Sequence, residues 1–203
     1  MKIFLKTEDE IELMRNANRL VGKTLGAIGK HIEPGVTTLQ LDKIAEEFIR
    51  DNGAVPTFKG FPNPFGKPFP ASICTSVNDV VVHGVPDAET VLRDGDIISV
   101  DCGVLLDGFN GDSCYTFCVG EVGAEVRKLI DVTKEALFCG IENAVAGRHI
   151  GDIGHAVQDC CETRGYGVVR ELTGHGIGRQ MHEDPPVPNY GSAGSGGLLR
   201  DGV

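Results

Sequence analysis

Tryptophan is missing from this sequence, aromatic residues make up only 6% of it, and no apolar run approaches the length of a membrane span. Basic residues are also few, with 19 Lys and Arg against 29 Asp and Glu, and they form no dense cluster. The net charge of −10 argues against nucleic acid or an anionic membrane as the main partner. The N-terminal stretch MKIFLKTEDEIEL lacks the apolar core of a signal peptide. We therefore expect a cytoplasmic protein that binds neither a membrane nor a specific nucleic acid.

Cysteine is present but in no pattern that predicts a disulfide or zinc scaffold. The seven cysteines are odd in number and scattered, and none forms a CxxC motif. Reduced thiols, mostly buried, are the favoured interpretation, and they agree with a cytoplasmic location.

Apolar spacing and turn residues predict the order of the elements. Capping boxes at Thr7 and Thr37 open two amphipathic helices, which reach to about Lys30 and to Asn52-Gly53. Further predicted elements are helices over 125–143 and 151–164, and strands over 71–77, 80–82, 96–103 and 167–172. The Pro/Gly/Phe-rich segment 55–70 is either a plain ordered loop or an apolar pocket wall, and the small, polar segment 189–197 is expected to be mobile.

A β-hairpin is predicted around Asp107-Gly108, a two-residue turn signal between β-favouring runs. In this register Asp112 lies opposite Gly103, and Asp101 lies two residues further along on the same face. Two neighbouring carboxylates in apolar surroundings persist if cations lie between them or if one is protonated. The alternative is that Asp112 only caps the turn and Asp101 points to solvent, and the hairpin alone leaves both open.

The order helix, break, helix, Gly, strand occurs twice. A shift of 112 places Gly35 on Gly147 and brings the apolar positions of the two helices into register, and Leu92-Arg93-Asp94-Gly95 recurs as Leu199-Arg200-Asp201-Gly202. We expect an α+β fold of two αα-β halves related by a pseudo-twofold, with a curved antiparallel sheet in one layer and helices on one face. The halves cover about 1–120 and about 121–203. The second is expected to be incomplete, because the counterpart of Asp101 would fall beyond Val203.

Two of the six histidines stand out. His175 lies between glycines in Gly174-His175-Gly176-Ile177-Gly178, where a ligand can approach the backbone, and His182 follows in Met181-His182-Glu183-Asp184-Pro185. Two Asp and a His suit divalent Co, Mn, Fe or Zn better than a closed structural zinc site. His31, His149 and His155 lie in helices or at helix ends without a partner motif, so we expect structural roles for them, and His83 lies directly before a Gly84-Val85-Pro86 turn.

Together these motifs resemble a family, the type I methionine aminopeptidases of the pita-bread (creatinase/aminopeptidase) fold. The resemblance rests on Asn78-Asp79-Val80-Val81-Val82-His83-Gly84, on Asp101 and Asp112 with ten residues between them, and on the two histidine motifs. It covers Glu8 to Val203 and implies a single pita-bread catalytic domain over 1–203.

The resemblance implies the roles of the site residues. Asp101, Asp112 and His175 would ligate two divalent metal ions, which activate a water for attack on the peptide carbonyl after an N-terminal methionine. His83 and His182 would contact the substrate as catalytic residues, and the methionine pocket would be formed by Phe58, Phe61, Cys74 and Met181. The implied substrate is the N-terminal methionine of nascent polypeptides, a transient ribosome contact is compatible with that role, and we expect a monomer.

This chain departs from the family in ways that matter for activity. The family has two glutamate ligands C-terminal to the LRDG-like turn, and the sequence ends before both, so we expect a C-terminally truncated chain that is itself inactive. Robust release of methionine from Met-Ala-Ser by this chain with manganese or cobalt would refute that expectation. The segment Pro62 to Pro70 is longer than in short bacterial relatives, and the N-terminal zinc-finger extension of eukaryotic forms is absent.

Two alternatives remain from the residues alone. One is a prolidase-like Xaa-Pro peptidase of the same fold, which the absence of a large N-terminal domain and the His-Glu-Asp-Pro context disfavour. The other is a non-catalytic pita-bread module that binds a partner protein, which the intact Asp101, Asp112 and His175 disfavour.

Overall fold

The computed structural model describes residues 3–63 and 66–203. Part of the predicted rim segment Pro62 to Pro70, residues 64–65, therefore lies outside the described residues. The chain divides into two compact units, unit 1 (1–11, 124–177 and 182–203) and unit 2 (12–123 and 178–181), and each is described by itself.

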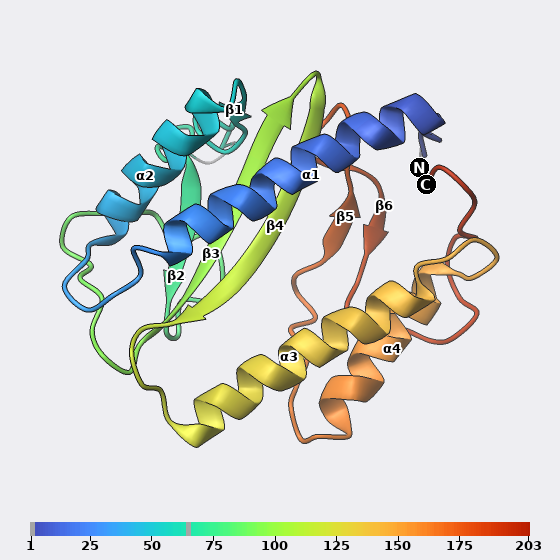
Figure 1. Ribbon diagram of the computed structural model, residues 1–203. Helices are drawn as coiled ribbons and strands as arrows, with labels where there is room; N and C mark the ends of the chain where they lie inside the picture. The colour runs from blue at the N-terminus through green and yellow to red at the C-terminus, as the bar shows by residue number, and fades with distance from the viewer. Residues whose placement is uncertain (1–2, 64–65) are drawn as a thin grey trace. The chain divides into compact units, whose positions relative to one another are not determined.

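The described residues form helices and strands in the order drawn in Figure 1. The helices are α1 (Glu8–Gly29), α2 (Thr38–Asp51), α3 (Ala124–Asn143) and α4 (Ile150–Glu162). The strands are β1 (Val55–Pro56), β2 (Ile73–Val77), β3 (Ile97–Leu106), β4 (Phe109–Cys118), β5 (Gly174–Gly176) and β6 (Glu183–Val187).

Local capping determines where the helices begin. At α1 the Glu10 amide donates to Thr7 Oγ1 and the Thr7 amide donates to Glu10 Oε2, while Thr37 and Gln40 form the same reciprocal box at α2. Both capping boxes expected from the sequence are confirmed. At α4 the cap is His149, whose amide donates to Asp152 at 2.7 Å, so His149 has the structural role expected for it.

Unit 2 is a four-stranded antiparallel sheet with α1 and α2 packed on one face. β3 pairs with β1, β2 and β4, and alternate β3 residues from Ile98 to Val104 lie in one buried core with apolar residues of both helices. Gly111 of β4 lies against this same layer, because a Cβ there would come within 2.7 Å of the Ala17 backbone of α1. The intervening β3 residues, among them Asp101 and Gly103, therefore point to the opposite face of the sheet.

The hairpin register is the predicted one. Leu106 pairs with Phe109, Gly103 with Asp112 and Asp101 with Cys114. Asp107 and Gly108 take φ values of 51° and 81°, as a two-residue hairpin turn with left-handed backbone requires.

Unit 1 contains the packed helix pair α3 and α4, side by side in Figure 1, and the two-stranded sheet β5–β6. The contact face of α3 carries small residues, Ala136 and Gly140, and a Cβ on Gly140 would lie 3.0 Å from Val157 of α4. Other large apolar residues of α3 stay in solvent, with Leu137 58% and Phe138 52% exposed. The apolar contact between α3 and α4 is therefore small, so polar contacts contribute a larger share of the stability of unit 1.

The predicted repeat appears in the hydrogen bonds of each unit. In unit 2 the Gly35 amide donates to the Leu92 carbonyl and the Leu92 amide to the Val36 carbonyl. In unit 1 the Gly147 amide donates to the Leu199 carbonyl, and the Leu199 amide to the Arg148 carbonyl. Matching bridges join Thr37 to Val91 and His149 to Leu198. The LRDG turns therefore anchor the break before the second helix of each half.

Some predicted elements are wrong. Residues 80–82 and 167–172 form no strand. The described strands are hydrogen-bonded into a four-stranded sheet in unit 2 and a two-stranded sheet in unit 1. The segment 189–197, expected to be mobile, is bound to α4 through Gly194 N to Asp152 Oδ1 (2.7 Å) and Gly151 N to Ser195 O (2.9 Å). Within the described ranges, no helix combines the length and the apolar character that a membrane span needs.

Candidate active site

Asp101 and Asp112 lie together on the sheet face of unit 2 that points away from α1 and α2. Both side chains are half-buried, and Asp112 pairs with Gly103, two residues from Asp101. Burial, the negative charge of Asp101 and a side-chain hydrogen bond with Asp101 raise the pKa of Asp112 to about 7. The alternative in which Asp101 points away into solvent is therefore wrong, and a cation between the two carboxylates would relieve their repulsion.

Two predicted pocket residues share this face. Cys74 of β2 pairs directly with Asp101, and burial followed by the charge of Asp101 raises the pKa of the Cys74 thiol to about 12. Phe58 lies over Gly103, because a Cβ on that glycine would come within 2.7 Å of Phe58 Cε1. A neutral thiol and an aromatic ring thus stand beside the carboxylates, as an apolar slot requires.

Asn110 links the remaining pocket segments to this face, and sequence patterns did not single it out. Its side chain accepts from Thr57 Oγ1 and donates to the carbonyls of Gly178 and Arg179, each at 3.1 Å. Gly178–Met181 belongs to unit 2, and Met181 is buried there. Phe61 is half-buried, and its amide donates to the Phe58 carbonyl at 2.9 Å.

His175 and His182 come together in unit 1. Their ring centroids are 4.3 Å apart, with His175 on β5 and His182 directly before β6. His175 Nδ1 lies 2.9 Å from the Gly176 carbonyl oxygen. Since a carbonyl only accepts, Nδ1 is the donor in this contact, and in this tautomer Nε2 is the nitrogen that could ligate a metal.

His83 lies in unit 2 on an exposed loop with left-handed backbone, φ 59°. The loop returns to β2 at Gly84, whose carbonyl accepts from Thr75 N at 2.8 Å. A Cβ on Gly84 would be 2.1 Å from the Thr75 oxygen, so glycine is required there. Gly84 therefore holds the His83 loop against β2, and β2 is the strand in which Cys74 pairs with Asp101.

The predicted site residues thus fall into two groups that the units hold separately. Asp101, Asp112, Cys74, Phe58, Met181 and His83 belong to unit 2, and His175 and His182 to unit 1. Over the described residues, neither unit alone groups three His, Cys, Asp or Glu side chains to hold a metal ion. The convergence of Asp101, Asp112 and His175 remains a prediction.

A buried ion pair supports the histidine motif of unit 1. Lys6 Nζ lies 2.8 Å from Glu183 Oε2, with 10% and 5% of the two side chains exposed, and Glu183 directly follows His182. The Lys6 amide also donates to the Gly202 carbonyl at 2.7 Å. No periodicity or motif indicates a pair 177 positions apart in sequence.

Replacing Lys6 by methionine should lower the midpoint of thermal unfolding by about 10 °C, because removing the ammonium from a buried carboxylate costs about 3–5 kcal/mol. Arg15→Met is the control, since the Arg15–Glu12 pair is 54% and 55% exposed and should be worth about 1 kcal/mol at most. Equal shifts for both variants in calorimetry would contradict a special role for Lys6.

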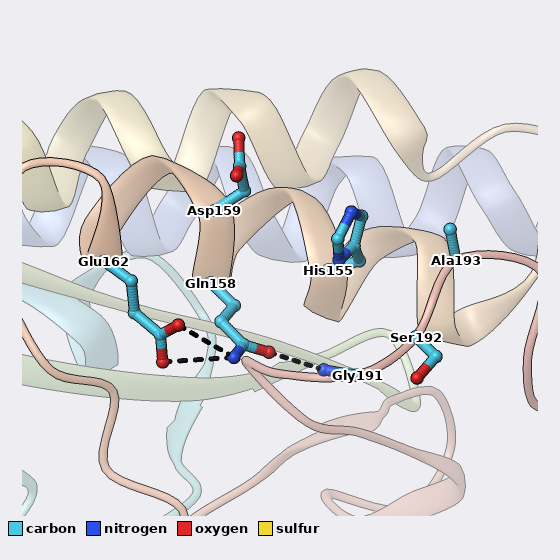
Figure 2. A pocket seen from close by; sticks show the side chains of 7 residues that line it. All are labelled: His155, Gln158, Asp159, Glu162, Gly191, Ser192 and Ala193. Carbon is cyan, nitrogen blue, oxygen red and sulfur yellow. Dashed lines mark hydrogen bonds between the residues drawn. The ribbon is translucent and has the colours of Figure 1, made fainter.

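A separate open hollow of roughly 380 Å³ lies on unit 1 (Figure 2), lined by His155, Gln158, Asp159, Glu162, Gly191, Ser192 and Ala193. Gln158 spans it by donating to Glu162 and accepting from the Gly191 amide at 3.2 Å. The hollow contains none of the predicted site residues. Its polar contacts fasten the segment around Gly191 to α4.

Comparison with solved structures defines the class of protein. The chain superposes on a methionine aminopeptidase from Rickettsia prowazekii with a TM-score of 0.93 and 42% identity, covering 99% of this chain and 79% of that one. A prolidase from Pyrococcus furiosus shares the fold with a TM-score of 0.82 at 22% identity, covering 98% of this chain and 55% of that one. The fold is the pita-bread fold.

Sequence comparison gives the family. Residues 12–203 match the profile of metallopeptidase family M24. A methionine aminopeptidase from Clostridium acetobutylicum is 52% identical over 201 residues, which cover 99% of this chain and 78% of that protein. Methionine aminopeptidase 1 of Bacillus subtilis is 45% identical over the same length, 79% of that protein. The chain belongs to metallopeptidase family M24 and is an enzyme of that family.

Proposed function

We propose that this protein removes the N-terminal methionine from nascent polypeptides by metal-dependent hydrolysis. The observation that carries the proposal is the carboxylate pair Asp101 and Asp112 beside Cys74 and Phe58, on one face of the sheet of unit 2. Relatives at 45% and 52% identity are named methionine aminopeptidases, which supports the choice of methionine.

The proposed ligands of two divalent cations (Co, Mn, Fe or Zn) are Asp101, Asp112 and His175. The raised pKa of Asp112 reflects a half-buried pair of like charges, and the lone pair on His175 Nε2 fits a borderline metal, so these residues suit the group. When bound, such cations supply Lewis acidity that polarises the peptide carbonyl and activates water.

The chain's own residues would hold and polarise the substrate. Phe58, Phe61, Cys74 and Met181 form the proposed slot for an unbranched thioether side chain. His182 donates to the carbonyl oxygen as charge develops, and His83 meets the scissile nitrogen. Each such preorganised donor lowers the barrier by about 2–4 kcal/mol.

The proposed setting is one catalytic domain over residues 1–203, acting as a monomer in the cytoplasm on nascent chains, with a transient ribosome contact. The free thiols of all seven cysteines and the net charge of −10 agree with this setting.

The test is calorimetric binding by the 203-residue chain. Co²⁺ should bind at two sites per chain, and His175→Ala should weaken this binding at least tenfold, whereas His155→Ala, on the exposed face of α4, should not. With metal present, Met-Ala-Ser should bind at least tenfold more tightly than Ala-Pro.

The other outcomes would favour one of the two alternative functions. A preference for Ala-Pro would favour a prolidase-like peptidase. A chain that binds neither metal nor peptide would favour the non-catalytic binding module.

A further inference from the structure

Asn110 is a buried residue at the start of β4 whose backbone amide, side-chain nitrogen and side-chain oxygen bond to other segments of unit 2. It is 3% exposed and lies two residues before Asp112. Its backbone amide donates to the Gly178 carbonyl at 2.8 Å, and its side-chain nitrogen donates to the carbonyls of Gly178 and Arg179. Its side-chain oxygen accepts from Thr57.

These contacts reach two parts of the proposed methionine slot. Thr57 directly precedes Phe58, whose ring lies against Gly103 on the face that carries the carboxylates. Gly178 and Arg179 lead into Met181, which is 7% exposed. Arg179 is further fixed by its guanidinium, 4.4 Å from the ring centre of Phe109, the neighbour of Asn110.

Only a side-chain amide meets this pattern. Two carbonyls need donors and one hydroxyl needs an acceptor, and asparagine supplies both from one short side chain. An aspartate at this position would set a carboxylate against two carbonyl oxygens. A leucine would remove the side-chain donors to both carbonyls, so that of these donors only the backbone amide to Gly178 would remain.

We infer that Asn110 is a positioning residue that sets the width of the slot for the first side chain of the substrate, by fixing Phe58 and Met181 relative to Asp112. The inference rests on the proposed function for the identity of that side chain. The anchoring itself rests on the four hydrogen bonds of Asn110.

The experiment compares Asn110→Leu, Asn110→Asp and Thr57→Val with the parent chain. Hydrogen exchange of the Gly178–Met181 segment should accelerate at least tenfold in Asn110→Leu and Asn110→Asp, and remain unchanged in Thr57→Val. In the metal-loaded chain, the preference for Met-Ala-Ser over Ala-Ala-Ser should fall about tenfold in Asn110→Leu. That loss should vanish in a Met181→Ala background, because the wall that Asn110 positions is then already gone.

The control is Asn143→Ala, which removes another side-chain donor to a backbone carbonyl, Cys139 O at 2.9 Å, in α3 of unit 1. It should change neither the exchange of Gly178–Met181 nor the preference. Unchanged hydrogen exchange of the Gly178–Met181 segment in Asn110→Leu would overturn the inference. So would a double variant, Asn110→Leu with Met181→Ala, in which the loss of preference for Met-Ala-Ser over Ala-Ala-Ser equals the sum of the losses in the two single variants. A parent chain that binds no methionine peptide would refute the proposed function, while the exchange result still decides whether Asn110 anchors the segment.

Discussion

Asp112→Asn should abolish tight binding of divalent metal and at the same time make the metal-free protein more stable. We expect a loss of at least 100-fold in Co²⁺ affinity, because a carboxylate that would hold the cations becomes a neutral amide. We also expect the midpoint of thermal unfolding to rise by about 3 °C or more at pH 8, because the repulsion between Asp101 and Asp112 disappears.

The raised pKa of Asp112 determines whether the free energy of unfolding rises or falls with pH. The pKa of Asp112 is raised to about 7 in the folded chain, above its ordinary value, so the folded state holds a proton that the unfolded state releases. The resulting stability is present in acid and is lost as the pH rises through about 7. Metal-free parent chain should therefore lose stability in urea titrations between about pH 4 and pH 7, and Asp112→Asn should lose less.

Asp107→Asn is the matched control, because it makes the same change five residues away in the exposed turn of the same hairpin. Asparagine tolerates the left-handed backbone at that position, where φ is 51°. It should leave metal affinity and the slope with pH as in the parent. If Asp112→Asn were less stable than the parent at pH 8, the two carboxylates would not repel each other as described.

The sequence predicted those parts of the fold that local chemistry decides. The Asp107-Gly108 turn set the register of ten residue pairs, because a two-residue turn leaves only one way to pair the strands. The capping boxes at Thr7 and Thr37 could also be predicted, because each joins residues only three positions apart in the sequence.

The errors come from segments whose partners decide their structure. Val80 to Val82 has strong β-propensity, but it follows a left-handed turn at Asn78 (φ 52°), and β2 takes Gly84 as its partner instead. Propensity describes how well a residue fits a strand and not whether a neighbouring strand exists. The segment 167–172 likewise forms no strand.

Asn110 and Lys6 escaped prediction because their partners are distant in sequence. The side-chain bonds of Asn110 join residues 53 to 69 positions apart. A single sequence shows a plausible strand residue there, and only the folded sheet shows that it holds the segments of Phe58 and Met181 together.

Gly103→Val should close the proposed methionine slot while leaving metal binding within about twofold of the parent. A Cβ at this position would come within 2.7 Å of Phe58 Cε1 and 3.2 Å of Cδ1 and Cζ, so the ring must move. The added side chain would then occupy the space beside Asp112 that the substrate side chain needs. We expect at least a 100-fold loss of Met-Ala-Ser affinity in the metal-loaded chain, measured by calorimetry.

The free energy of unfolding distinguishes the clash between the new side chain at position 103 and Phe58 from the general effect of replacing a glycine. In a strand, exchanging glycine for valine ordinarily stabilises by up to about 1 kcal/mol, whereas overpacking costs about 1–3 kcal/mol. Gly103→Val should therefore lower the free energy of unfolding in urea, and Phe58→Leu in the same chain should recover part of it, because the two side chains compete for one space. Gly26→Ala in α1, where nothing lies within 4 Å of the added Cβ, should instead raise stability by about 1 kcal/mol. A Gly103→Val chain that is more stable than the parent and binds the peptide as the parent does would place the methionine slot away from this face of the sheet.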